Sequence, residues 1–158
     1  MEPGRLGPRI ARAVAHLLPR TSEGRAYPGD YSGPVDICYC PDLDGEADPG
    51  EVVWGWIPYE DDNSQGKDRP SLVIGRDGRW LLVLMLSSKD KDASDGAHER
   101  QEVWIDVGSG PWDRERRPSE VRVDRVIRLA DNAVRREGAI LDRQRFDAVA
   151  AAVRLARP

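Results

Sequence analysis

The sequence has few of the residues that build metal sites, disulfide frameworks or membrane spans. Its 158 residues include two cysteines and two histidines, and His16 and His98 are too isolated to form a metal-ligand cluster. The longest apolar run, residues 80–86, is far shorter than the roughly 20 residues of a membrane-spanning helix. Arg9 and Arg12 interrupt the amino-terminal apolar stretch, and no small-residue cleavage site follows it. We therefore expect a cytoplasmic protein with no membrane span, no metal and no cofactor.

The two cysteines, Cys38 and Cys40, are two residues apart in a segment, residues 35–40, that reads as a short strand. In a strand both side chains would lie on one face, about 7 Å apart, which is too far for a disulfide without distortion. We therefore expect two separate, buried thiols in a reducing compartment.

Charge is plentiful: 33% of the residues are charged, and the net charge is −4. A net negative charge taken alone argues against nucleic acid as a partner. The charges are unevenly spread, because residues 42–62 hold eight acidic residues and no basic one, whereas residues 64–91 hold six Lys or Arg and three Asp. Binding depends on the field within about 8 Å at physiological salt, so a basic loop on an acidic protein can still bind phosphate.

Short alternating apolar segments predict a mainly β fold of one domain. We expect strands over residues 51–57, 71–75, 80–87, 102–107 and 119–129. An Asp-Gly pair at residues 77–78 predicts a tight hairpin between the second and third of these strands. Since no βαβ spacing occurs, we expect a small antiparallel barrel or a strongly curled sheet.

Helical periodicity occurs at both ends of the chain. Residues 7–20 repeat apolar side chains at helical spacing, and Pro19 ends the pattern. Near the carboxy terminus Asp142 is a candidate N-cap. The apolar face of this second helix consists of Phe146, Val149, Ala150 and Val153.

Composition divides the chain into two parts. Prolines and glycines are concentrated between residues 21 and 50, which indicates a loop-rich linker. We therefore predict an amino-terminal extension over residues 1–49 and a compact domain over residues 50–158.

Three separated segments carry a recognisable pattern. Gly-Glu-Val-Val-Trp at residues 50–54 opens a strand, Ser-Gln-Gly-Lys-Asp-Arg-Pro at residues 64–70 forms a polar loop, and Leu-Ser-Ser-Lys at residues 86–89 ends a strand. With Val-Asp-Arg-Val at residues 123–126 and the closing helix, they resemble the MazF/PemK family of toxin endoribonucleases. The resemblance covers about two-thirds of the chain. It implies an SH3-like small antiparallel β-barrel, to which the amino-terminal and carboxy-terminal helices predicted above are added, a homodimer, and a cognate antitoxin as partner.

The resemblance also implies a site that cleaves single-stranded RNA without a metal. RNA can be cut by its own 2′-hydroxyl, so the protein must supply charge stabilisation and proton transfer rather than a nucleophile. Arg69, pre-organised by the following proline, would stabilise the transition state and donate a proton, and Ser87 would orient a phosphate oxygen. Ser88 is the alternative hydroxyl. The substrate-binding residues implied are Gln65, Lys67, Ser88 and Lys89.

The chain departs from the family pattern at two positions. Ser64 stands where an acidic residue usually precedes the loop glutamine, and Ser87 stands where threonine is commoner. Two other functions stay open: a CcdB-like toxin that binds DNA gyrase and cuts nothing, and an inactive family member that acts as a regulatory RNA- or protein-binding module. The retained Arg69 and Ser87 argue against the first, and the acidic surface and Ser64 keep the second open.

Tryptophans could stack on unpaired bases, but in strands of a small barrel they usually belong to the core. Trp54 and Trp56 share one strand face and are expected to be core residues. Trp112 lies in an irregular segment between Pro111 and Asp113, and we expect it to be the most exposed tryptophan.

Overall fold

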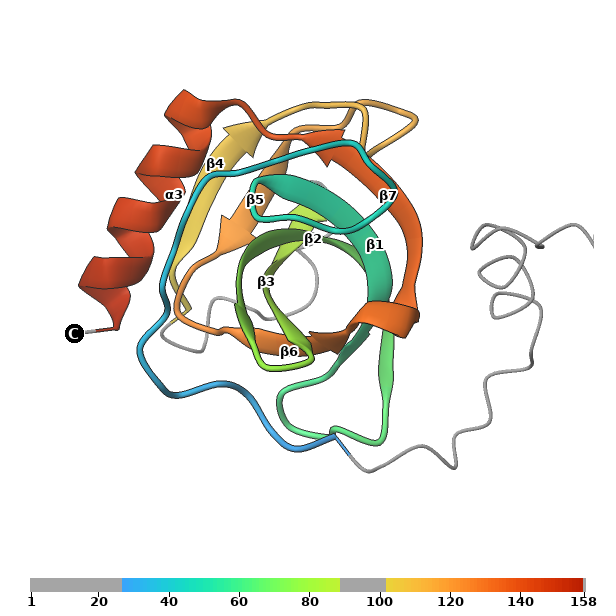
Figure 1. Cartoon of the computed structure of the whole chain (residues 1–158), viewed down its shortest axis with the longest axis vertical. Coiled ribbons are helices and arrows are strands. Elements are labelled where there is room, and N and C mark those ends of the chain that lie inside the picture. The colour runs from blue at the N-terminus through green and yellow to red at the C-terminus, as the bar shows by residue number, and fades with distance from the viewer. Residues whose placement is uncertain (1–26, 89–101, 158) are drawn as a thin grey trace, which may run out of the picture.

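The computed structural model describes residues 27–88 and 102–157, which form a curled antiparallel sheet and a carboxy-terminal helix (Figure 1). The strands are β1 (Glu51–Pro58), β2 (Gly66–Asp77), β3 (Trp80–Ser88), β4 (Trp104–Gly108), β5 (Ser119–Arg122), β6 (Ile127–Ala130) and β7 (Val134–Ile140). A 3-10 turn (Asp131–Ala133) precedes β7, and the helix α3 (Arg143–Ala156) follows it. The amino-terminal helix predicted over residues 7–20 lies outside the described residues.

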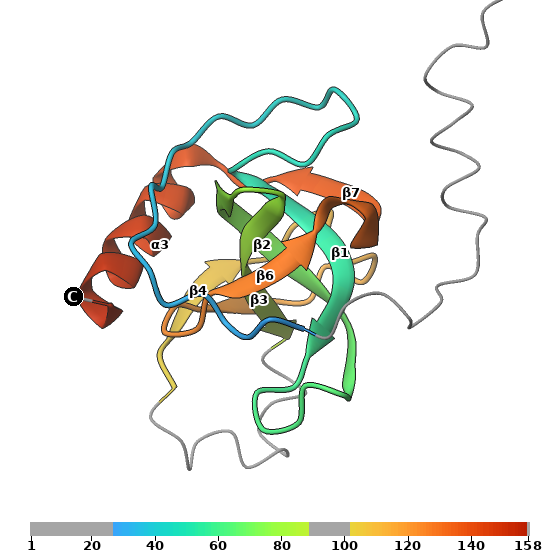
Figure 2. The same cartoon turned by 60° about the horizontal axis from the view of Figure 1, so that its bottom comes forward.

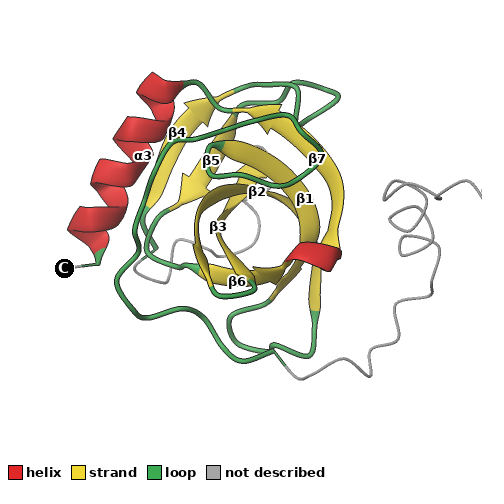
Figure 3. Ribbon diagram, in the orientation of Figure 1, coloured by secondary structure: helices red, strands yellow, loops and turns green. Residues whose placement is uncertain are grey.

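Strand β3 is the branch point of the sheet. The strand order is β4-β5-β3-β2-β1-β7, and β6 also pairs with β3. The first half of β3 pairs with β6, as in Trp80 with Ala130, and its last residues pair with β5, as in Ser87 with Glu120. Because one strand serves two partners, the sheet curls into the ring of strands seen end-on in Figure 3. The predicted curled antiparallel sheet is confirmed.

Two differences from the predicted strands follow from pairing rather than local sequence. The segment 119–129 is not one strand but two, β5 and β6, which pair with different parts of β3. Strand β7 was not predicted, because its sequence, VRREGAI, has no clear alternation. It forms by pairing with β1, with two register irregularities.

The central strands are buried on both faces. Val52 and Val53 are neighbours on β1 and both are 0% exposed, but they belong to different apolar clusters. One cluster lies between the sheet, β4, β5 and α3, and the other lies inside the curl against β6. This two-sided burial explains why β3 reads as a continuous apolar run.

The β2–β3 hairpin turns one residue later than the sequence suggested. Asp77 pairs with Trp80, so the two-residue loop is Gly78-Arg79 rather than Asp77-Gly78. Gly78 has a φ of 58°, in the left-handed region that favours glycine.

The carboxy-terminal helix confirms its predicted cap and face. The Asp142 carboxylate accepts a hydrogen bond from the Arg145 backbone N–H at 3.0 Å. The buried residues of α3 are the four predicted ones, Phe146, Val149, Ala150 and Val153. In the part of the chain that the structure describes, no helix has the length and apolar character needed to cross a membrane.

Residues 27–50 form an extended strap that runs across the outside of the sheet and past α3 before entering β1 (Figures 1 and 2). The strand predicted at residues 35–40 is wrong, because this segment is extended but pairs with no neighbouring strand. It is held by side chains instead: the Tyr39 hydroxyl donates to the Leu141 carbonyl at 2.7 Å, and its ring lies 5.0 Å from that of Phe146. The division at residue 49 stays a prediction.

The two cysteines are free thiols, but the prediction that they are buried and separated is wrong. Cys38 and Cys40 are exposed, because the inward positions of the strap are taken by Ile37 and Tyr39. Their sulfur atoms lie 3.1 Å apart, in contact rather than separated. The hydrogen bond with Cys38, followed by burial, raises the pKa of Cys40 to about 11.

Candidate active site

The fold brings Arg69 and Ser87, 18 positions apart in sequence, into direct contact. Strands β2 and β3 pair in a register that matches Ser71 with Met85, so two residues further along Arg69 comes opposite Ser87. The Arg69 Nη1 donates a hydrogen bond to the Ser87 Oγ at 3.1 Å. Ser87 is 5% exposed and Arg69 is half-buried. A guanidinium and a hydroxyl therefore form one polar pair at the end of the sheet.

Ser88 faces the other side of the sheet from this pair, because successive side chains of a strand alternate. It pairs with Ser119 on β5, whose hydroxyl accepts a hydrogen bond from the Trp112 indole at 3.2 Å. Of the two candidate hydroxyls, Ser87 is the one that contacts Arg69.

The loop between β1 and β2 presents the other predicted substrate residues. Gln65 and Lys67 are exposed. The backbone N–H of Tyr59 donates to the Gln65 carbonyl at 2.8 Å, which closes the loop. Ser64, the departure from the family pattern, donates its hydroxyl hydrogen to the Asp62 carboxylate at 2.6 Å. Lys89 lies outside the described residues.

Strand β5 carries a buried arginine, Arg122, that the sequence did not single out. The Arg122 side chain is 7% exposed and forms ion pairs with Glu60 at 2.7 Å, with Asp124 at 2.9 Å and with Glu102 at 3.5 Å. Burial alone would lower the pKa of Arg122 and raise that of Asp124, but their mutual hydrogen bonds reverse both effects. The arginine is therefore fully charged and surrounded by carboxylates.

Glu120 was also missed by the sequence analysis. It pairs with Ser87 across the β3–β5 ladder and with Asp106 across the β4–β5 ladder. The available signal was its position: Glu120, Arg122 and Asp124 alternate with buried valines, which looks like a solvated strand face. Because β5 pairs with β3, this face of β5 lies beside Ser87.

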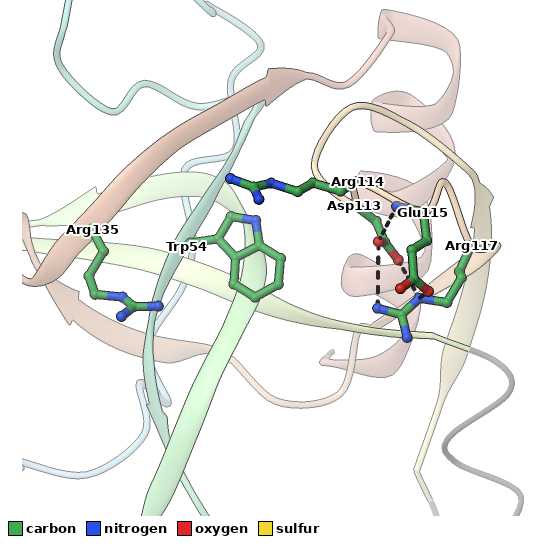
Figure 4. A pocket seen from close by; sticks show the side chains of 6 residues that line it. All are labelled: Trp54, Asp113, Arg114, Glu115, Arg117 and Arg135. Atoms are coloured by element: carbon green, nitrogen blue, oxygen red, sulfur yellow. Dashed lines mark hydrogen bonds and ion pairs between the residues drawn. The ribbon is translucent and has the colours of Figure 1, made fainter.

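The other side of the sheet carries an open cavity of about 510 Å³ beside Trp54 (Figure 4). The Trp54 indole N–H donates to the Trp112 carbonyl at 2.8 Å, which fixes the half-buried ring. In Figure 4 the Arg114 guanidinium lies above that ring and Arg135 lies to its left. An aromatic surface with two guanidiniums near it is suited to stacking an unpaired base and binding its phosphate.

The acidic side of this cavity is neutralised internally. Asp113 accepts a hydrogen bond from the Arg117 Nε at 2.8 Å, and that bond is the main reason why its pKa is lowered. Glu115 lies 3.5 Å from the same guanidinium.

The prediction that Trp112 is exposed is wrong. It is 2% exposed and belongs to the larger apolar cluster, since the loop folds back and inserts the indole beneath β5. The irregular local sequence concealed a core residue.

The described residues contain no group of three or more His, Cys, Asp or Glu arranged to hold a metal ion. Both histidines of the chain lie outside residues 27–88 and 102–157.

Comparison with known proteins places the chain in a family. A search of curated proteins finds no match. A family model described as PemK-like, MazF-like toxin of type II toxin-antitoxin system matches residues 48–156. That match spans α3 and the seven strands that the structure describes, and it includes both members of the Arg69–Ser87 pair. The chain therefore belongs to the PemK-like, MazF-like toxins of type II toxin-antitoxin systems.

Proposed function

We propose that this toxin is an endoribonuclease that cleaves single-stranded RNA at specific sequences, without a metal, through attack by the RNA 2′-hydroxyl. The observation that carries the proposal is the 3.1 Å hydrogen bond between Arg69 and Ser87 in a chain of this toxin family. The products would be a 2′,3′-cyclic phosphate and a free 5′-hydroxyl.

Arg69 supplies the charge that this reaction requires. Its guanidinium can donate two parallel hydrogen bonds to the phosphate oxygens as negative charge builds up on them. Because Ser87 is almost fully buried and bonded to Arg69, its hydroxyl can hold one of these oxygens in a fixed position. The arginine also protonates the leaving 5′-oxygen, so no metal is needed.

The remaining contacts belong to binding. Gln65, Lys67 and Lys89 bind the RNA strand beside the scissile phosphate, and Ser88 contributes from the end of β3. The family implies a cognate antitoxin. We propose that this antitoxin covers the RNA-binding groove and that the groove spans the interface of a homodimer in the cytoplasm.

The mechanism predicts that a single deoxyribose at the scissile position stops cleavage. The substitution removes the attacking hydroxyl and leaves the phosphates in place, so binding should persist and the strand should act as a competitive inhibitor. Affinity should fall as salt rises, because Lys67 and Arg69 meet phosphates. Denaturing gels would measure cleavage, and fluorescence anisotropy would measure binding. Cleavage of the deoxy strand at an unchanged rate would refute internal attack, and a protein that binds no RNA would not be an RNA toxin.

A second prediction concerns the two hydroxyls of β3. Ser87→Ala should slow cleavage about tenfold, the effect of losing one neutral hydrogen bond of roughly 1.4 kcal/mol in the transition state. Ser88→Ala is the matched comparison, because it removes the same atom from the other face of the strand. As a binding residue it should weaken RNA affinity but leave the rate at saturating protein within about twofold. The rates should be measured under single-turnover conditions. The reverse result, a slow Ser88→Ala and a normal Ser87→Ala, would move the role to Ser88.

A further inference from the structure

The proposed reaction leaves one requirement unassigned, a group that accepts the proton of the 2′-hydroxyl. Arg69 is protonated before the reaction begins and so cannot accept a proton, and the Ser87 hydroxyl is too weak a base. The described residues contain no histidine. Among them, the acceptor must therefore be a carboxylate near the Arg69–Ser87 pair.

Glu120 has the right position. It stands directly opposite Ser87 in the β3–β5 ladder. Directly opposed residues point to the same face and have Cβ atoms about 4.5–5.5 Å apart. Since Ser87 is bonded to Arg69 at 3.1 Å, the fold gathers a guanidinium, a hydroxyl and a carboxylate on one face.

The other carboxylates that share this face are engaged. Glu60, Glu102 and Asp124 surround Arg122, the next residue of β5 on the same side as Glu120. Asp106, on the far side of β5 from Ser87, accepts a hydrogen bond from the Gly108 N–H at 2.8 Å. The Glu120 side chain is half-buried, and it forms no hydrogen bond or ion pair with the side chains that the structure describes. Of these carboxylates it is the one placed to act on a substrate.

We propose that Glu120 is the catalytic proton acceptor, an inference that rests on the proposed RNA cleavage. Its carboxylate takes the proton of the 2′-hydroxyl as the 2′-oxygen bonds to phosphorus. The bond from phosphorus to the 5′-oxygen breaks, and the 5′-oxygen takes a proton from Arg69. Glu120 then releases its proton to water and Arg69 regains one, so the protein returns to its starting state.

Glu120→Gln tests this assignment, because it keeps the shape and removes the base. Single-turnover cleavage should slow by about a hundredfold, at the low end of what a positioned base contributes. Affinity for the deoxy-substituted RNA should not weaken. In Glu120→Ala, added formate should restore part of the rate, which a merely structural role would not allow.

Glu46→Gln is the matched control. It removes one negative charge at an exposed side chain of the strap, outside the strands that carry the site, so the wild-type rate should persist. A Glu120→Gln variant that cuts RNA at the wild-type rate, or a slow Glu120→Ala variant that formate does not rescue, would overturn the role of Glu120 alone. A wild-type protein that cuts no RNA would overturn the proposed function and this inference together.

Discussion

Replacing Arg69 by alanine is expected to slow RNA cleavage by about 10² to 10³, the usual effect of removing one transition-state stabiliser. The side chain is half-buried at the end of the sheet and donates to the Ser87 hydroxyl, so its loss removes charge from the site without opening the core. The melting temperature and circular dichroism should stay close to those of the wild type. Single-turnover cleavage of a defined RNA is the measurement.

Two companion variants make this test specific. Arg76→Ala removes an arginine from the same strand, where it forms an exposed ion pair with Asp131 at 3.1 Å, and it should cut RNA normally. Arg69→Lys keeps the charge but loses the planar guanidinium, which can donate two parallel hydrogen bonds, so it should recover only part of the rate. If Arg69→Ala cuts at the wild-type rate, the site lies elsewhere.

Replacing Trp112 by alanine is expected to lower the free energy of unfolding by about 3–5 kcal/mol. The indole is 2% exposed within the larger apolar cluster, and its N–H donates to the Ser119 hydroxyl at 3.2 Å. Truncation would leave a cavity next to β5, the strand that carries Glu120. Urea unfolding followed by circular dichroism measures the loss.

Arg114→Ala is the control for Trp112. It lies in the same loop and is exposed, so its free energy of unfolding should change by less than about 0.5 kcal/mol. Trp112→Phe keeps most of the apolar volume and should fall between the two. A Trp112→Ala variant as stable as Arg114→Ala would show that the loop does not close the core.

The elements that sequence predicted well are those whose pattern is local. Strands β1 and β3 have compact apolar runs, and α3 has both a side-chain cap at Asp142 and an apolar stripe. Strand β7 escaped prediction because it depends on its partner β1. The division of residues 119–129 between β5 and β6 depends likewise on β3, which is far away in sequence.

The candidate site also depends on pairing between segments that are distant in sequence. The resemblance identified Arg69 and Ser87 individually, but only the β2–β3 register brings the two side chains together. Glu120 and Arg122 looked like solvent-facing charges because alternation reports which residues share a face, and not what covers that face. Trp112 was misjudged for the same reason, since an irregular loop can still insert a side chain into the core.

The strap has a practical consequence for anyone who shortens this protein. The family match begins at residue 48, but the Arg125 guanidinium, 5% exposed, is paired with Asp30 of the strap at 2.8 Å. A fragment that began at the family boundary would leave the Arg125 charge buried without its partner. Such a defect commonly lowers the free energy of unfolding by about 3–5 kcal/mol. The truncation would also remove Tyr39 from Phe146 and uncover part of the face of α3. Fragments and fusions should therefore retain the chain from residue 27 onward.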